Sequence, residues 1–479
     1  MNDVSSMTKL LEPAEDGPLH ADRHCTAPTL WVHVSTLMNW SRPPVGIVRV
    51  EQEYCRWLLA RSDASGARFC VYDRHAGAFR EVHREAVAER LRAAHAPAHA
   101  AASSPAASLT GWKRHARTVW RRLLPYIPPQ TAVDLRDRLR HEWRRARAVG
   151  HRVRDALRRP HAAAVADVGA PAAFARGDHW VSMGLDWDYL DQRALFRLKQ
   201  RHALRITLVC YDVIPALFPQ LVVLPPGGFG AYIVDLAWCA DEVLCISEHT
   251  RRDLEALLLR LGAPVPSLRV FRLGSDVRST HAAHPPPGFA HGPGERPFVL
   301  YVSTLERRKN HEVLYRAWTR LREGGMLPHR LVFVGMRGWG IGDLMQDLAL
   351  DPRVRDDIIL LDRVDDAQLE WLYRNCAFTV YPSLYEGWGL PLVESFAWGK
   401  FCLSSNAASL PEAGGTLAEY LDPWDLPAWT ERLAHYMRHP EALAEREERI
   451  AREFAAPTWT ETANQIHRVA TSTAARRIP

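Results

Sequence analysis

The sequence predicts an α/β protein built from two doubly wound, Rossmann-like domains that face each other across a cleft. Strand-like apolar runs alternate with helical segments in both halves of the chain, a pattern typical of parallel sheets covered by helices. A proline- and glycine-rich stretch at 285–294 separates the two halves. The length of 479 residues is sufficient for two or three domains.

The first half opens with a buried strand at 30–35, followed by a loop and a helix that begins after Gly46. Its later strand-like runs lie at 179–184, 206–212, 242–247 and 268–274. The second half repeats the alternation. Its strands are expected at 298–303, 331–335, 358–361, 377–381 and 400–404, and its helices at 311–322, 426–437 and from 459 onward.

These patterns divide the chain into five parts. We expect a disordered tail at 1–28, a first domain at 29–284 with a basic helical insert at about 92–176, a linker at 285–296, a second domain at 297–458, and a terminal helix at 459–479.

Composition excludes several classes of protein. Hydrophobic residues make up 47% and charged residues 24%, which is typical of globular proteins. No run of eighteen apolar residues is long enough to span a bilayer, and the tail at 1–28 lacks the apolar segment of a secretion signal. The eight cysteines form no Cys-x-x-Cys pair, so we expect reduced thiols in a cytosolic protein.

The insert carries most of the basic charge. Residues 112–159 contain fifteen Lys or Arg and four acids, with Trp112, Trp120 and Leu124 interleaved among the arginines. This composition suits an interfacial helix on an anionic membrane. A solvated helical hairpin packed on the catalytic domain fits equally well. Nucleic acid is a weaker alternative because no recognisable nucleic-acid fold accompanies the patch, so no nucleic-acid partner is expected.

The segment 381–394 is the most informative part of the chain. A β-prone run is followed by Glu386-Gly387-Trp-Gly389, and a helix is expected to begin near Leu390-Pro391. Such a strand–turn–helix unit points free N–H groups and a helix dipole into a crevice, where phosphate can bind. Glu386 can accept hydrogen bonds from sugar hydroxyls, and Glu394 can chelate two neighbouring hydroxyls. A nucleotide-sugar offers all of these groups.

This segment resembles the Glu-x7-Glu motif of retaining GT-B glycosyltransferases, in the large bacterial family that includes mannosyl- and rhamnosyltransferases. The resemblance extends over about 296–430 and more thinly over 29–55 and 205–278. It implies a GT-B fold with Glu386 at the sugar and Glu394 at the ribose. In that fold the domain at 29–284 is the acceptor domain, the domain at 297–458 is the nucleotide-sugar donor domain, and the terminal helix at 459–479 crosses back to the first domain.

Other positions complete the expected donor site. Arg308 and Lys309 follow the first strand of the second half, where cations suit a diphosphate. The resemblance adds Gly46 in the first strand–helix loop, which faces the diphosphate, and Val364 in the stretch that holds the base. Gly387, Gly389 and Leu390 form the turn and the helix start.

Two positions depart from the family pattern. Asp212 ends a strand and is expected to face the reacting sugar, but Tyr211 stands where the family has His. Thr304 stands where an Arg is common, and Arg308 is expected to supply that charge.

Asp186 and Asp188 spell Asp-x-Asp, the metal motif of the other large glycosyltransferase fold. Such short matches are frequent by chance, so we expect neither a metal nor another cofactor.

The resemblance implies a retaining, metal-independent hexosyltransferase. Mannose from GDP-mannose is the first donor expected, and the acceptor is expected to be a growing, lipid-linked bacterial surface glycan such as capsule or lipopolysaccharide. The enzyme would be cytoplasmic and peripheral on the inner membrane. Two alternatives stay open, a GT-B nucleotide-sugar epimerase and a catalytically degenerate scaffold subunit.

Overall fold

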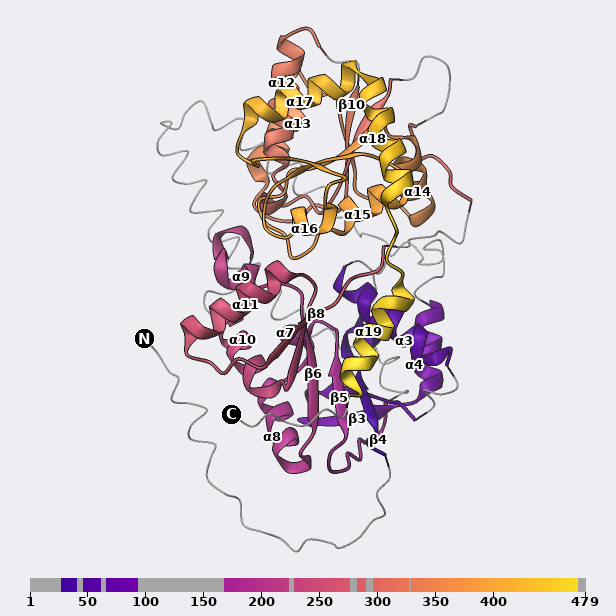
Figure 1. Ribbon diagram of the computed structural model, residues 1–479, viewed down its shortest axis with the longest axis vertical. Helices are drawn as coiled ribbons and strands as arrows, with labels where there is room; N and C mark the ends of the chain where they lie inside the picture. The colour runs from indigo at the N-terminus through magenta and orange to yellow at the C-terminus, as the bar shows by residue number, and fades with distance from the viewer. Residues whose placement is uncertain are drawn as a thin grey trace, which may run out of the picture.

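The computed structural model describes residues 27–40, 46–61, 66–93, 168–223, 228–275, 282–289, 296–326 and 329–472. They form two α/β domains placed one above the other (Figure 1). The tail expected at 1–28 and nearly all of the basic insert lie outside these residues.

The first domain is built on an eight-stranded sheet with the order β4-β3-β2-β1-β5-β6-β7-β8. Its strands are β1 (Leu30–His33), β2 (Arg68–Asp73), β3 (Ala78–Val82), β4 (Val168–Pro171), β5 (His179–Ser182), β6 (Arg205–Cys210), β7 (Glu242–Cys245) and β8 (Ser267–Val270).

This sheet differs from the expected parallel sheet at one edge. Strand β3 runs antiparallel to both β2 and β4, whereas all other neighbours are parallel. Strand β4 lies inside the predicted insert, so residues 168–171 belong to the sheet of the first domain.

The second domain has a six-stranded sheet with the order β11-β10-β9-β12-β13-β14, and every pair is parallel. Its strands are β9 (Phe298–Val302), β10 (Arg330–Val334), β11 (Ile358–Leu361), β12 (Phe378–Tyr381), β13 (Cys402–Ser405) and β14 (Glu419–Leu421). Numbered within the domain, this is the 3-2-1-4-5-6 order of a dinucleotide-binding Rossmann sheet, which reverses direction between β9 and β12.

Helices cover both faces of each sheet. In the first domain they are α2 (Ser35–Asn39), α3 (Ile47–Leu59), α4 (Arg84–Ala93), α7 (Asp186–Tyr189), α8 (Gln192–His202), α9 (Ile214–Leu217), η4 (Pro219–Leu221), α10 (Gly228–Cys239) and α11 (Glu248–Leu261). In the second domain they are η5 (Arg307–Lys309), α12 (His311–Glu323), α13 (Gly342–Leu350), α14 (Asp366–Asn375), α15 (Leu390–Ala397), α16 (Leu410–Gly414), α17 (Leu426–Arg438) and α18 (Pro440–Glu453).

Period-two alternation along the strands builds the core on both faces. In β1, Leu30 and Val32 join the cluster beneath α3 and α4, whereas Trp31 joins the cluster beneath α8, α10 and α11. In β9, Val299 and Tyr301 face α12, while Phe298 and Leu300 face α14. Strands buried on both sides read as continuous apolar runs, which is why the sequence predicted them well.

The last helix, α19 (Trp459–Ala470), belongs to the first domain although it follows the second. Figure 1 shows it beside α3, below the domain that precedes it in the chain. Ser275 N donates to Pro457 O at 2.9 Å, and Thr462 Oγ1 donates to Arg272 O at 2.8 Å. A capping box of Thr458 and Glu461 fixes the start of the helix.

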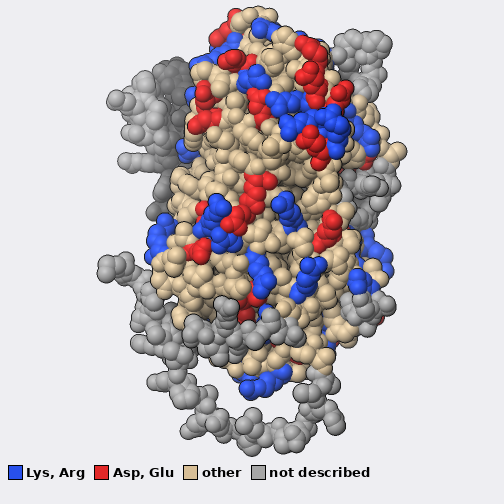
Figure 2. All heavy atoms as spheres, in the orientation of Figure 1, with Lys and Arg blue, Asp and Glu red and all other residues tan. Residues whose placement is uncertain are grey.

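Charges on the visible face of the described chain are mixed. Figure 2 shows acidic and basic side chains interleaved over both domains, with uncharged areas between them. None of the described helices is long and apolar enough to cross a membrane.

Candidate active site

The candidate site lies where the strand order of the second sheet reverses. Loops that leave the carboxyl ends of β9 and β12 meet there, and such a switch point is where open α/β sheets bind ligands. The loop after β9 carries Arg308 and Lys309, and the turn after β12 carries Glu386. Residues that are far apart in the sequence are therefore brought together by topology.

Glu386 is buried and bonded to both predicted cations. Lys309 Nζ donates to Glu386 Oε1 at 2.5 Å, and Arg308 donates through Nη1 to Oε2 at 2.7 Å. Arg308 also donates through Nη2 to Glu306 Oε1 at 2.7 Å. The result is a buried network of two carboxylates and two cations. Such networks hold their geometry because losing one partner leaves an unpaired buried charge.

The network determines how Glu386 titrates. Burial by itself would raise the pKa of its carboxyl, but the charges of Arg308 and Lys309 outweigh that effect and lower the pKa to about 2. Burial lowers the pKa of Lys309, and the nearby Glu386 opposes that shift. Glu386 is therefore an anion throughout the physiological pH range, able to accept hydrogen bonds but not to supply a proton.

Two glycines of the turn are required by the space around them. A Cβ on Gly387 would lie 2.3 Å from Tyr211 O and 3.1 Å from Asp212 Cβ, so the turn presses directly on the first domain. Gly389 has a φ of 117° and caps α15, and a Cβ there would meet Leu410 Cδ2 at 2.6 Å. The turn expected from the sequence thus also forms the contact between the domains.

Asp212 reaches the site from the first domain. It follows β6, and its Oδ1 accepts the N–H of Ile214 at 3.0 Å. Burial raises the pKa of its carboxyl, and the charges of Arg308 and Lys309 act against that shift. Asp212 is therefore close enough to the cations to feel their field, and it lies at the boundary between the domains, next to the turn that carries Glu386.

Glu394 lies one turn into α15 and is held from two sides. Tyr373 OH, from α14, donates to Glu394 Oε2 at 3.0 Å. Arg49 Nη1, from α3 of the first domain, lies 3.9 Å from Glu394 Oε1. Burial raises the pKa of the Glu394 carboxyl, while Arg49 opposes the shift.

The remaining predicted residues surround this centre. Gly46 precedes α3 with a φ of 49°, in the loop that leads to Arg49. Leu390 opens α15. Val364 lies between β11 and α14, packed against the cluster around Trp371, and so stands beside the helix that carries Tyr373. No contact described for Val364 joins it directly to Glu394.

The sequence analysis missed a second contact between the domains. Glu412, in α16, accepts the N–H groups of Glu248 at 2.8 Å and His249 at 3.2 Å, and so caps α11 of the first domain. Tyr385 OH bonds to Asp253 Oδ2 at 2.5 Å and to His249 Nε2 at 2.9 Å. The sequence could not have predicted this contact, because a cap that another domain supplies leaves no local pattern.

Asp186 is occupied by its own domain. Its Oδ1 accepts from Ser182 Oγ at 2.6 Å and lies 3.3 Å from His33 Nδ1. Asp188 is exposed, although partial desolvation of its carboxyl raises the pKa of that group. In the described parts of the chain, no group of three or more His, Cys, Asp or Glu side chains is arranged to hold a metal ion.

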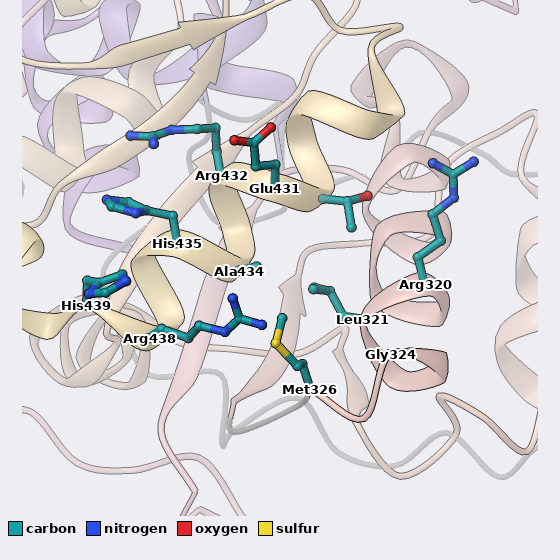
Figure 3. Close-up of a pocket in the computed structure, with 11 residues that line it drawn as sticks. Arg320, Leu321, Gly324, Met326, Glu431, Arg432, Ala434, His435, Arg438 and His439 are labelled. Atoms are coloured by element: carbon teal, nitrogen blue, oxygen red, sulfur yellow. The ribbon is translucent and has the colours of Figure 1, made fainter.

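A basic cavity of about 450 Å³ lies elsewhere, between α12 and α17 (Figure 3). Arg320, His435 and Arg438 line it. Arg320 stands in the last turn of α12, and the other two stand in the last turn of α17, where cations complement the negative end of a helix dipole. The helices thus explain this charge without a ligand, and the cavity is separate from the Glu386 network.

Comparison with known proteins agrees with this architecture. One solved structure, Alr3699/HepE of Anabaena in complex with UDP and glucose, covers 92% of this chain and 99% of its own, with a TM-score of 0.50 and 13% identity. The fold is therefore that of a GT-B glycosyltransferase, as expected. Residues 289–424 match the family model described as Glycosyl transferases group 1, so the chain carries a domain of that family.

Curated relatives match part of the chain. The O-antigen chain mannosyltransferase B of Escherichia coli is 36% identical over 131 residues, which are 27% of this chain and 34% of the relative. The serotype-specific mannosyltransferase WbdA of Escherichia coli is 27% identical over 198 residues, 39% of this chain and 24% of the relative. The matched segments thus span about a third or less of these relatives' length.

Proposed function

We propose that this chain is a retaining glycosyltransferase that moves a hexose, with mannose the first candidate, from a nucleoside diphosphate to a hydroxyl of a growing glycan. The observation that carries the proposal is the buried network of Glu386, Arg308 and Lys309 at the switch point, next to Asp212 of the first domain. Cations here suit the departing diphosphate, and Glu386 suits the hydroxyls of the sugar. The two mannosyltransferase relatives favour GDP-mannose as the donor.

Each residue then has a defined task. Glu394 accepts from the ribose hydroxyls, with Tyr373 holding its other oxygen. Lys309 and Arg308 neutralise the diphosphate as negative charge develops on it in the transition state. Retention in the resembled family is described as front-face attack, in which the leaving phosphate takes the acceptor's proton. Asp212 stands on the acceptor side, where it can orient the attacking hydroxyl.

The direct test is release of nucleoside diphosphate and transfer of sugar with a panel of GDP-, UDP- and TDP-hexoses. The proposal expects slow hydrolysis of one donor without acceptor, and transfer with the anomeric configuration retained when a glycan hydroxyl is present. Interconversion of the donor without transfer would indicate an epimerase instead. Absence of donor binding and turnover would indicate a scaffold subunit.

The reaction is proposed to need no divalent metal. Lys309 and Arg308 occupy the position in which a metal would otherwise offset the diphosphate charge. Activity should therefore survive EDTA. Complete loss with EDTA and recovery with manganese would contradict this and would direct attention to Asp186 and Asp188.

We also propose that the acceptor is lipid-linked and that residues 112–159 hold the enzyme on the inner face of an anionic membrane. The excess of basic over acidic residues there supports it, since each cation near such a surface contributes about 1 kcal/mol, screened by salt. The wild type should sediment with anionic vesicles at low salt. The charge-reversed variant Arg117→Glu/Arg121→Glu/Arg122→Glu should not, while its donor hydrolysis should match the wild type. Equal sedimentation of both proteins would overturn this assignment.

A further inference from the structure

Arg49 extends from the first domain toward Glu394 of the second domain. It lies in the first turn of α3, after the loop that contains Gly46, and its side chain is only 19% exposed. The interaction described for it is with Glu394 of the second domain, at 3.9 Å from Nη1 to Oε1. That separation is an ion pair and is too long for a hydrogen bond.

This leaves the guanidinium of Arg49 poorly satisfied. It has five N–H donors, and among the described contacts none of them makes a hydrogen bond. Its position near a helix N-terminus is also unfavourable, because the helix dipole is positive there. Within the described chain, α3 has no acidic residue in its first turn and no side-chain cap to offset that charge. A mostly buried cation in this state is suited to an incoming anion.

The proposed donor provides such an anion beside Glu394. When the ribose hydroxyls donate hydrogen bonds to Glu394, the first phosphate of the nucleotide lies one ester bond beyond the ribose. We propose that Arg49 binds the diphosphate of the donor through its planar fork, from the side opposite Lys309 and Arg308. This inference rests on the proposed function, since it assigns a further residue to the same donor.

The assignment links donor binding to the relative position of the domains. Lys309, Arg308 and Glu394 all belong to the second domain, whereas Arg49 belongs to the first. The diphosphate would then be clamped by cations from both domains. When the donor binds, Arg49 would also exchange its ion pair with Glu394 for an ion pair with the phosphate. Glu394 would then be able to accept hydrogen bonds from the ribose.

The test compares a nucleoside diphosphate with its own nucleoside. Whichever of GDP and UDP binds the wild type more tightly is titrated calorimetrically, and guanosine or uridine is measured by ligand-observed NMR. Arg49→Ala should weaken diphosphate binding by about 10- to 100-fold, the loss expected for hydrogen bonds to a charged group. Nucleoside binding should change less than about twofold, because Glu394 still holds the ribose. Arg49→Lys, which keeps the charge without the fork, should fall between.

Two controls make the result unambiguous. Arg56→Ala removes a cation from the same helix that pairs with Glu53, and should leave both ligands unaffected. Glu394→Ala should weaken nucleoside and diphosphate equally. If Arg49→Ala also weakened both ligands equally, or weakened neither, the phosphate assignment would be overturned. Failure of the wild type to bind any nucleoside diphosphate would instead reject the proposed function, and this inference with it.

Discussion

Arg308 donates to Glu386 Oε2 while Lys309 holds the other oxygen of the same carboxylate, at 2.7 and 2.5 Å. Glu386 is thus the anion that two buried cations share. A donor that brings its own diphosphate competes for those cations, which would free Glu386 for the sugar. Stability and donor binding should therefore be coupled at this carboxylate.

Glu386→Gln should lower the free energy of unfolding by on the order of 3 kcal/mol, because Arg308 and Lys309 lose their shared anion. A nucleoside diphosphate should restore part of this loss by replacing the missing charge. The measurement is thermal unfolding with and without saturating ligand, where the variant should gain more than the wild type. An equal ligand-induced shift in both proteins would show that the diphosphate binds elsewhere.

Glu394→Ala should weaken binding of the nucleoside diphosphate by tenfold or more. A charged acceptor is lost, and each hydrogen bond to such a group contributes about 1.5–3 kcal/mol. Titration calorimetry provides the affinity. Glu370→Ala is a matched control, since Glu370 is a carboxylate of neighbouring α14 that pairs with Arg374 at 2.9 Å. Unchanged affinity in Glu394→Ala would refute the ribose assignment.

Gly387→Ala should disrupt the contact between the domains. Its Cβ would lie 2.3 Å from the carbonyl oxygen of Tyr211, so either the turn or the first domain must shift. Because catalysis requires reacting atoms to be placed within about an ångström, turnover should fall roughly 100-fold. Gly342→Ala is the control, as nothing lies within 4 Å of its added Cβ. Wild-type turnover in Gly387→Ala would mean that the active state is more open than this structure.

Glu51 should make stability fall as pH rises. It is fully buried in α3, and burial raises the pKa of its carboxyl from 4.5 to about 8. Between these values the folded chain holds a proton that the unfolded chain has released, so folding weakens toward alkaline pH. Each tenfold difference in proton affinity between the folded and unfolded chain corresponds to about 1.4 kcal/mol of stability at most.

The check is urea unfolding of Glu51→Gln and wild type at pH 5 and pH 8.5. The variant should lose less stability between these two pH values, by about 1–4 kcal/mol. Glu53→Gln is the control, because Glu53 is a partly exposed carboxylate of the same helix, and this variant should behave like the wild type. Parallel pH dependence in all three proteins would mean that Glu51 ionises normally.

The sequence predicted the Glu386 turn, the two cations after β9 and the second domain because these are local patterns. A buried strand, a glycine turn and a helix start each leave their own signal within a dozen residues. The position of Arg49 opposite Glu394 leaves none, because it depends on how two domains meet. The antiparallel hairpin of β2 and β3 was also missed, since both strands include partly exposed charged side chains instead of a long apolar run.

Asp212 lies between these cases. Its position at the end of a strand was readable, and the fold brings it beside the site. Burial raises the pKa of its carboxyl and cations from the other domain act against that shift, and no local pattern encodes either effect. Local rules thus located the residues, while the charges they feel arose from the tertiary arrangement.

Helix α19 gives the order of synthesis a physical consequence. Trp459, Ala463 and Ile466 are buried against the first domain, yet they are translated after the whole second domain. Until α19 leaves the ribosome, the surface of α3 that it covers stays open to water. The domain made first is therefore the last to be completed.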